Sequence, residues 1–109
     1  MISWEDFEKL KIHVGTILEV EDLPKARKPA YKLLIDFGHL GKLKSSAQLT
    51  VLYSKEELIQ KQVIAVVNLP PKQIGNFMSE CLVLGIYGDD QEIVLLQPQR
   101  PVQNGAKIG

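Results

Sequence analysis

The sequence predicts a mainly β fold, a small closed barrel with short helices, and three observations support this prediction. Several segments alternate apolar and polar residues with the period of two that puts successive side chains on opposite faces of a strand. Glycine and proline residues separate these segments, as expected for turns. The chain has 109 residues, 45% of them apolar, so we expect one domain with one core over residues 1–109.

The N-terminal part predicts a short helix and then a long strand. Ser3 is placed as an N-cap before acidic residues, so a helix of one to two turns is expected through Leu10. Residues 10–20 then alternate as a half-buried strand, with His13 on its polar side and Gly15 at a bend or bulge. The charged segment that follows contains two prolines and is predicted to be a loop.

Two further strands are expected in the middle of the chain, at residues 31–37 and 42–50. In the second of these, alternation puts Leu43, Ser45, Ala47 and Leu49 on the core face and Lys42, Lys44, Ser46 and Gln48 on the outer face. Ammonium, hydroxyl and amide groups suit a phosphate backbone, a sugar edge or an extended peptide. An ordinary solvated sheet face has the same alternation, so this pattern alone does not decide between binding and solvation.

The C-terminal half predicts a short helix and three strands. Ser54 and Glu57 have the spacing of a capping box, so a helix is expected from there to about Lys61. Pro70-Pro71 and an irregular loop containing Gly75 are expected between strands. The predicted strands are residues 63–67, which are apolar on both faces, 80–86 and 93–96.

Three strands, a short helix and two more strands is the order of an OB-fold. This fold is a five-stranded Greek-key β-barrel that binds oligonucleotides on its second and third strands and the adjacent loops. We therefore expect an OB-fold with a short helix between strands 3 and 4, a short N-terminal helix and a C-terminal extension. Other small β-barrels remain alternatives on this order alone.

Charge is balanced over the whole chain but uneven along it. Thirteen basic residues match thirteen acidic ones. Between residues 23 and 75, however, nine basic residues, Lys25 among them, face only three acidic ones, and the flanks carry the excess acid. The distribution favours an acidic partner at one site, although unevenly shared surface charges give the same count.

No arrangement of residues in the sequence predicts catalysis. The two histidines, His13 and His39, have no local catalytic partner, and there is no metal-binding cysteine pair, phosphate-binding glycine loop or nucleophile motif. Asp89-Asp90 is expected to be a surface turn. Cys81 is the sole cysteine and lies in an apolar run, which is typical of a small buried residue. We therefore expect no enzymatic activity, no metal and no cofactor.

The sequence also predicts a cytoplasmic protein without membrane insertion. No window approaches the roughly 20 apolar residues of a membrane span. The first residues are acidic, where a secretion signal is basic and then apolar.

Motifs along nearly the whole chain resemble the CsaA proteins. The resemblance rests on Ile12-x-Val14-Gly15-Thr16-Ile17, Lys25-Ala26-Arg27-Lys28-Pro29-Ala30-Tyr31-Lys32-Leu33, Ile35-Asp36-Phe37-Gly38, Lys44-Ser45-Ser46-Ala47-Gln48, Val67-Asn68-Leu69-Pro70-Pro71-Lys72, Phe77-Met78-Ser79-Glu80 and Leu82-Val83-Leu84-Gly85. It implies a homodimeric OB-fold related to the tRNA-binding domains appended to some methionyl- and phenylalanyl-tRNA synthetases, described in bacteria as a chaperone that assists preprotein export. The chain departs from the appended domains at Ser46-Ala47-Gln48, where they usually carry a Ser-Gly pair, so their tRNA contacts do not transfer directly.

The first functional hypothesis is that the chain binds tRNA or another structured RNA on two basic faces of a dimer. Phe37 is patterned inward, which leaves Tyr31, Tyr53 and Phe77 as the candidate stacking rings, so a folded RNA is favoured over a bare single strand. The candidate RNA-binding residues are Arg27, Lys28, Lys32, Lys42, Lys44, Ser46, Gln48, Lys72 and Asn76.

The alternative hypothesis is a peptide-binding chaperone for unfolded preproteins. In it Ile74, Phe77 and Met78 line a pocket, and an extended chain adds to a strand edge at the rim of strands two and three. Phe77 and Met78 would otherwise simply cap the barrel. For the dimer contact we expect residues 93–108, together with Trp4 and Phe7, although the C-terminal segment would equally serve to cover an open barrel edge.

Overall fold

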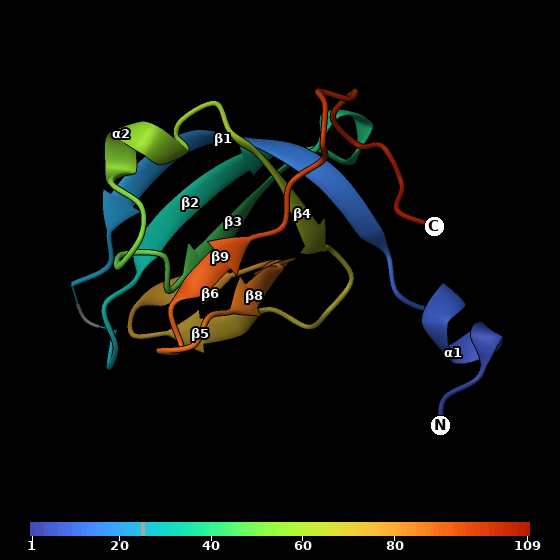
Figure 1. The fold of residues 1–109 in the computed structure, drawn as a ribbon, viewed down its shortest axis with the longest axis horizontal. Coiled ribbons are helices and arrows are strands. Elements are labelled where there is room, and N and C mark those ends of the chain that lie inside the picture. The colour runs from blue at the N-terminus through green and yellow to red at the C-terminus, as the bar shows by residue number, and fades with distance from the viewer. Residues whose placement is uncertain (25) are drawn as a thin grey trace.

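A nearly closed antiparallel barrel forms the body of the molecule in the computed structural model, which describes residues 1–24 and 26–109 (Figure 1). Its five-stranded sheet has the order β3-β2-β1-β4-β7. The edge strands approach each other because the Ser45 hydroxyl on β3 donates a 2.9 Å hydrogen bond to the Cys81 carbonyl beside β7. The barrel strands are β1 (Ile12–Asp22), β2 (Tyr31–Asp36), β3 (Lys42–Ala47), β4 (Gln62–Val66) and β7 (Leu82–Val83). The predicted mainly β, OB-type fold is confirmed.

The core follows the alternation of β2, as predicted. Other members come from β1, β4, β9 (Ile93–Leu95) and α2 (Lys55–Leu58), and from the segments that follow β2 and β3 and that precede β7. The buried core consists of Ile17, Tyr31, Leu33, Ile35, Phe37, Leu49, Leu58, Val63, Ala65, Cys81 and Leu95. Ile17 corrects the predicted pattern, because it was placed on the polar side of its strand and is fully buried. The reason is a bulge between Ile17 and Glu19, which shifts the register of β1 against β2.

The C-terminal segment, residues 104–108, covers an edge of β1. The amide of Val14 donates to the Ala106 carbonyl at 3.0 Å, and the amide of Ile108 donates to the Ile12 carbonyl at 2.9 Å. β1 pairs with β2 only from Thr16 onward, so this segment supplies hydrogen-bond partners that the first half of β1 lacks. His13 was predicted on a polar face, but here it is buried, with Nδ1 2.9 Å from the Gly105 carbonyl oxygen.

Both short helices begin with a capping box, which was predicted for Ser54 and Glu57, whereas Ser3 was predicted only as an N-cap. The Ser3 hydroxyl accepts from the amide of Asp6 at 3.1 Å at the start of α1 (Trp4–Glu8), and the Ser54 hydroxyl accepts from the amide of Glu57 at 3.2 Å at the start of α2 (Lys55–Leu58). The return hydrogen bond from the Ser54 amide lowers the pKa of the Glu57 carboxyl. α2 ends before Lys61 because the backbone is extended at its C-cap and Gln60 has φ 72°.

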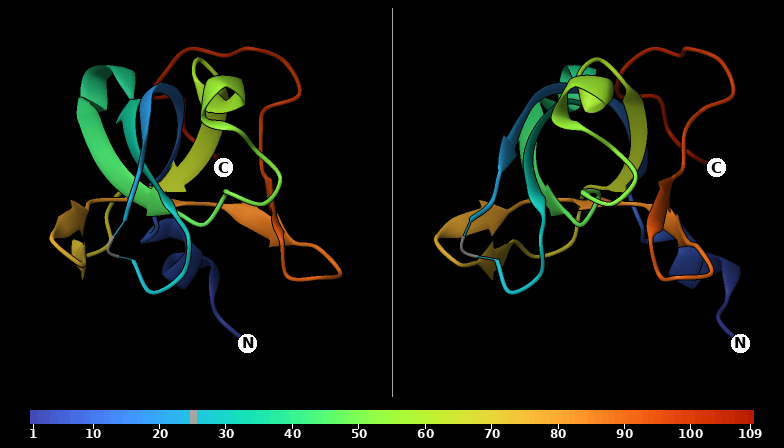
Figure 2. Two further views of the ribbon diagram at one scale, coloured as in Figure 1. Left: turned by 90° about the vertical axis from the view of Figure 1, so that its left-hand side faces the viewer. Right: turned by 60° about the vertical axis from the view of Figure 1, so that its left-hand side comes forward.

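The region after β4 differs most from the prediction. The expected irregular loop is a hairpin of β5 (Lys72–Ile74) and β6 (Phe77–Ser79), with Gly75 at φ 61° in its turn. The expected strand 80–86 is divided into β7 and β8 (Gly85–Tyr87), because the chain leaves the barrel to pair with β9 (Ile93–Leu95). A 3-10 turn, η1 (Gly38–Leu40), joins β2 to β3. Figure 2 shows both hairpins at the same end of the barrel.

Candidate nucleic-acid interface

The outer face of β2 and β3 carries the predicted lysines. The strands pair antiparallel, with Lys32 opposite Ser46 and Leu34 opposite Lys44, so Lys32 and Lys44 are diagonal neighbours on one face. Lys42 and Lys44 are exposed, whereas Ser45, the residue after Lys44, is fully buried, as the alternation predicted. We call this surface the basic face; it consists of Lys32, Lys42, Lys44 and Ser46.

An aromatic ring from another element lies against the basic face. The Nζ atoms of Lys32 and Lys44 are 5.9 Å and 5.6 Å from the centroid of the same Phe77 ring on β6. Both distances are within the range of a cation–π contact. Phe77 was expected either as a stacking ring for RNA or as part of a peptide pocket, and the structure brings it together with two of the predicted RNA-binding lysines.

Hydrogen bonds to β3 fix the position of the β5–β6 hairpin. The amide of Glu80 donates to the Lys44 carbonyl at 2.7 Å, and the Glu80 carboxylate accepts from the Lys44 amide at 2.8 Å. The Ser79 hydroxyl accepts from the Ser46 amide at 3.0 Å. These contacts occupy the edge of β3, so an extended peptide would have to displace them to add a strand there.

Other predicted polar residues flank the basic face. Arg27 and Lys28 are exposed in the loop after β1, and Asn76 is exposed at the turn of the β5–β6 hairpin. Figures 1 and 2 show this loop and this hairpin beside each other at one end of the barrel. Lys25, which belongs to the same basic run of the sequence, lies outside the described residues.

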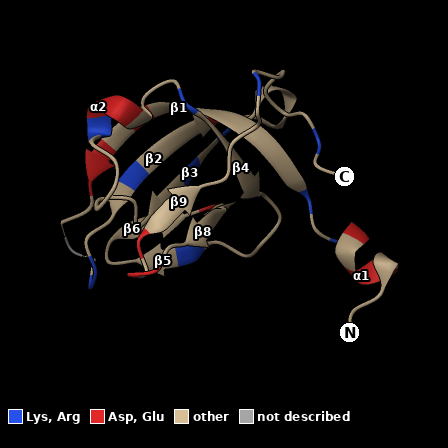
Figure 3. Cartoon of the chain, viewed as in Figure 1, with Lys and Arg blue, Asp and Glu red and all other residues tan. Residues whose placement is uncertain are grey.

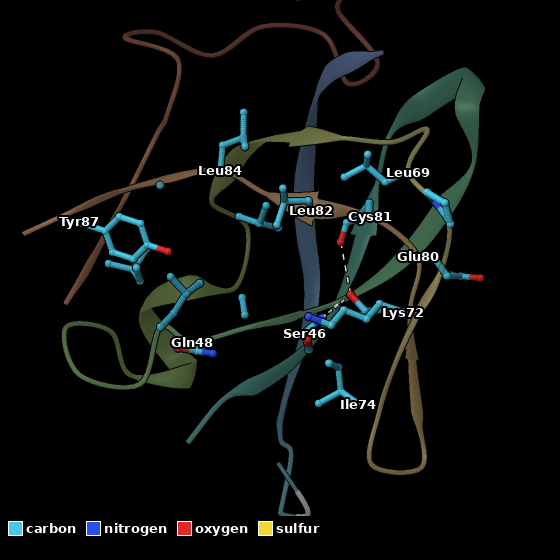
Figure 4. Close-up of a pocket in the computed structure, with 17 residues that line it drawn as sticks. Ser46, Gln48, Leu69, Lys72, Ile74, Glu80, Cys81, Leu82, Leu84 and Tyr87 are labelled. Carbon is cyan, nitrogen blue, oxygen red and sulfur yellow. Dashed lines mark hydrogen bonds between the residues drawn. The ribbon is translucent and has the colours of Figure 1, made fainter. Parts of the chain in front are cut away.

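A groove of about 610 Å³ opens beside the basic face, between the end of β3 and the segments around β5, β7 and β8. Ser46, Gln48, Lys72 and Ile74, all predicted binding residues, line it. The rest of its lining is largely apolar and includes Leu69, Leu82, Leu84, Tyr87 and Ile93. In Figure 4, Ser46, Lys72 and Ile74 lie near one end of the groove and Tyr87 near the other. Phe77 and Met78 are not among the lining residues.

The exposed aromatic rings differ from those expected. Tyr31 is buried, and its hydroxyl donates to the Tyr53 carbonyl at 2.8 Å. The Tyr53 hydroxyl in turn accepts from the amide of Leu95 at 3.0 Å. Both tyrosine hydroxyls therefore form hydrogen bonds within the protein. The aromatic rings that lie near the basic face and the groove are Phe77 and Tyr87. Tyr87, which is 72% exposed, was missed by the sequence analysis; the signal for it was an aromatic residue directly before the Gly88-Asp89-Asp90 turn.

Basic and acidic side chains are less separated on the surface than the sequence suggested. Figure 3 shows basic positions on β2, on the β5–β6 hairpin and in the loop after β1, but acidic positions on α2 lie at the same side. Lys32 forms an ion pair with Glu21 across β1 and β2, with Nζ 3.2 Å from Oε2. Lys55 pairs with Asp22 at 2.9 Å. The acidic end of β1 thus neutralises part of the basic charge.

Groups with potential chemical reactivity are few in the described part of the chain. Burial raises the pKa of the Cys81 thiol to about 12, so this cysteine is a neutral core residue at physiological pH. Residues 1–24 and 26–109 contain no group of three histidine, cysteine or acidic side chains placed to hold a metal ion. In those same residues no helix is long and apolar enough to cross a membrane.

Comparison with known proteins places the chain in a family. Residues 12–107 match the family described as putative tRNA-binding domain. The chain belongs to this family. Methionine–tRNA ligase of Nanoarchaeum equitans is 38% identical over 108 residues, and that of Porphyromonas gingivalis is 37% identical over 107 residues. The chain spans only 14% and 15% of the length of these two relatives, respectively.

Solved structures confirm the resemblance to CsaA. The CsaA chaperone of Picrophilus torridus is 54% identical with a TM-score of 0.94, and each chain covers 100% of the other. The CsaA chaperone of Bacillus anthracis is 48% identical with a TM-score of 0.95, over 100% of this chain and 99% of that one. A protein related to methionyl-tRNA synthetase from Pyrococcus horikoshii is 26% identical, with a TM-score of 0.88 over 100% of this chain and 98% of that one.

Proposed function

We propose that the chain is a non-enzymatic tRNA-binding protein of the CsaA type, one domain over residues 1–109, which acts in the cytoplasm as a homodimer. The basic face carries this proposal, because it presents three lysine side chains on the strands with which OB-folds bind nucleic acid. Membership of the putative tRNA-binding domain family supports it.

In this proposal Lys32, Lys42, Lys44 and Lys72 pair with phosphates, and Arg27 and Lys28 extend the contact from the neighbouring loop. Ser46, Gln48 and Asn76 donate to or accept from sugar and base edges. Such contacts recognise the shape of a folded RNA more than its sequence. A second protomer adds an equivalent face, which raises avidity through effective concentration.

A first experiment compares the wild type with Lys42→Glu/Lys44→Glu by fluorescence anisotropy of a labelled tRNA. We expect clear binding by the wild type and strong loss in the variant, because two attractive charges become repulsive. Lys61→Glu is the control for a single charge reversal away from the basic face, since Lys61 lies next to β4 and outside every candidate site. Equal binding by all three proteins would contradict the proposed RNA surface.

The dimer contact is proposed to involve two exposed apolar surfaces. No residue of α1 is buried, and Trp4 is 85% exposed. On the β8–β9 hairpin, Ile86 and Val94 form a cross-strand pair and are 54% and 40% exposed. We expect sedimentation equilibrium to show a dimer for the wild type and a monomer for Ile86→Glu/Val94→Glu. A monomeric wild type at micromolar concentration would contradict the dimer.

The second proposed activity is a chaperone role in protein export, and the apolar groove favours it. An extended segment of an unfolded preprotein could bury its side chains against Leu82, Leu84 and Tyr87. We expect the protein to suppress aggregation of a denatured client near equimolar ratio, even with excess tRNA present, and Leu82→Glu to abolish this effect. Loss of suppression on adding tRNA would instead place both ligands on one surface.

A further inference from the structure

The side chains of Lys32 and Lys44 on the basic face both contact the Phe77 ring, a contact that no local pattern in the sequence predicts. Lys32 and Lys44 are diagonal neighbours, so their ammonium groups repel each other if nothing lies between or beside them. The Phe77 ring is within 6 Å of both. The negative face of a ring offsets part of that repulsion and limits where the two charges lie.

Hydrogen bonds between β3 and the residues just after Phe77 place this ring beside the lysines. Phe77 lies two residues before Ser79, whose hydroxyl accepts from the Ser46 amide, and three before Glu80, which bonds to both backbone groups of Lys44. The strand that carries Lys44 therefore also positions Phe77. Exposed lysines otherwise lose considerable side-chain freedom on binding a ligand, and a pre-positioned pair loses less.

One of the two ammonium groups already has an anionic partner. The Glu21 carboxylate lies 3.2 Å from Lys32 Nζ, and the Glu21 side chain is 66% exposed. Exposed ion pairs of this kind contribute little free energy, so a phosphate that contacts both lysines can replace the carboxylate at small cost. Glu21 faces Lys32 directly from β1, which makes the exchange local.

We infer that Phe77 is a positioning residue that holds Lys32 and Lys44 as one phosphate-binding pair, and that Glu21 competes with phosphate for this pair. The inference rests on the proposed RNA-binding function and identifies the RNA phosphodiester as the group bound there. Phe77 thus belongs to the basic face and acts through the lysines.

The geometric part is tested by NMR of the lysine ε-methylene groups, with inorganic pyrophosphate as the probe. In the wild type the ring current shifts the Lys32 and Lys44 signals upfield, and pyrophosphate moves both. Phe77→Leu removes the ring current shift and weakens the pyrophosphate response, while Phe77→Tyr retains both effects. A wild type without pyrophosphate shifts at these two lysines overturns the inference, whether or not tRNA binds.

The functional part is tested with labelled tRNA at several salt concentrations. We expect Phe77→Leu to bind about threefold to tenfold more weakly and Phe77→Tyr to bind as the wild type does. Glu21→Gln should bind up to about fivefold more tightly, and this gain should vanish when Lys32 is also changed to Gln. Glu19→Gln, an equal charge change two residues away, measures the general effect of removing an acid.

The outcomes separate the two proposals. Absence of wild-type tRNA binding contradicts the proposed function, and the pyrophosphate titration then still decides whether the lysine pair binds phosphate. Binding by the wild type together with unchanged affinity in Phe77→Leu, or an equal gain from Glu19→Gln and Glu21→Gln, overturns the inference alone.

Discussion

Gly15 is the position at which a single added methyl group should disturb the barrel most clearly. It lies on β1 at the point where the strand crosses the core. A Cβ atom there would lie 2.6 Å from Ile35 Cγ2 and 2.7 Å from Phe37 Cδ1. Both neighbours are fully buried, so neither side chain has free space to enter.

The expected cost of Gly15→Ala follows from these contacts. Overpacking a well-packed core costs about 1–3 kcal/mol. The preference of strands for alanine over glycine recovers part of this, about 0.5 kcal/mol or more. For a domain of this size we expect the melting temperature to fall by roughly 4–10 °C.

The assay is thermal and urea denaturation followed by circular dichroism, with two glycine controls. Gly109→Ala meets no atom within 4 Å and should be neutral, while Gly41→Ala also meets none but has φ 89°, so it isolates backbone strain. Phe37→Leu should cost less stability in the Gly15→Ala background than in the wild type, since it removes the ring atoms that lie 2.7 Å and 2.8 Å from the added Cβ. A Gly15→Ala protein as stable as the wild type would refute the packing argument.

Three further predictions concern stability and reactivity. Ser54→Ala should lower the free energy of unfolding in urea by about 1 kcal/mol, because α2 holds the fully buried Leu58 against the core. Ser3→Ala should leave the urea transition unchanged, because no residue of α1 is buried. Equal effects of the two substitutions would contradict this and show that α1 unfolds together with the barrel. The raised pKa of Cys81 predicts slow alkylation of the native protein, and rapid labelling would contradict burial of this thiol. The same shift contributes stability that is intact below pH 9.0 and lost as the pH rises toward about 12. The unfolding free energies of the wild type and of Cys81→Ala should therefore converge over that pH range. Tyr31→Phe should lower the free energy of unfolding by about 1 kcal/mol, because the Tyr53 carbonyl loses its hydrogen-bond donor. Its affinity for tRNA should not change. Weaker tRNA binding would show that Tyr31 stacks on a base.

Local patterns in the sequence predicted the elements that carry a strong local signal. The alternation of residues 42–50 correctly placed Ser45 inside the barrel and Lys44 outside it. The spacing of Ser54 and Glu57 correctly predicted the start of α2. In both cases the pattern spans several residues and has a direct physical cause, either the pleat of a strand or a reciprocal pair of hydrogen bonds.

The elements that were missed depend on contacts between distant parts of the chain. The β5–β6 hairpin has strands of three residues each, too short for periodicity, although Gly75-Asn76 was an available turn signal. The bulge in β1 was expected at Gly15 but lies between Ile17 and Glu19, where it moves Ile17 into the core. The contact of Phe77 with the lysines arises from docking of the hairpin on β3, so no local pattern contains it.

The salt dependence of tRNA binding tests the central claim most directly, measured for the wild type beside Lys42→Glu/Lys44→Glu. If the basic face holds phosphates, the logarithm of the wild-type association constant falls steeply and linearly with the logarithm of salt concentration, and the variant loses about 0.9 of slope for each phosphate contact removed. The account predicts a slope reduced by about 2 for each protomer engaged, together with weaker binding at low salt. Equal slopes in the two proteins would contradict it and place any RNA contact elsewhere on the barrel.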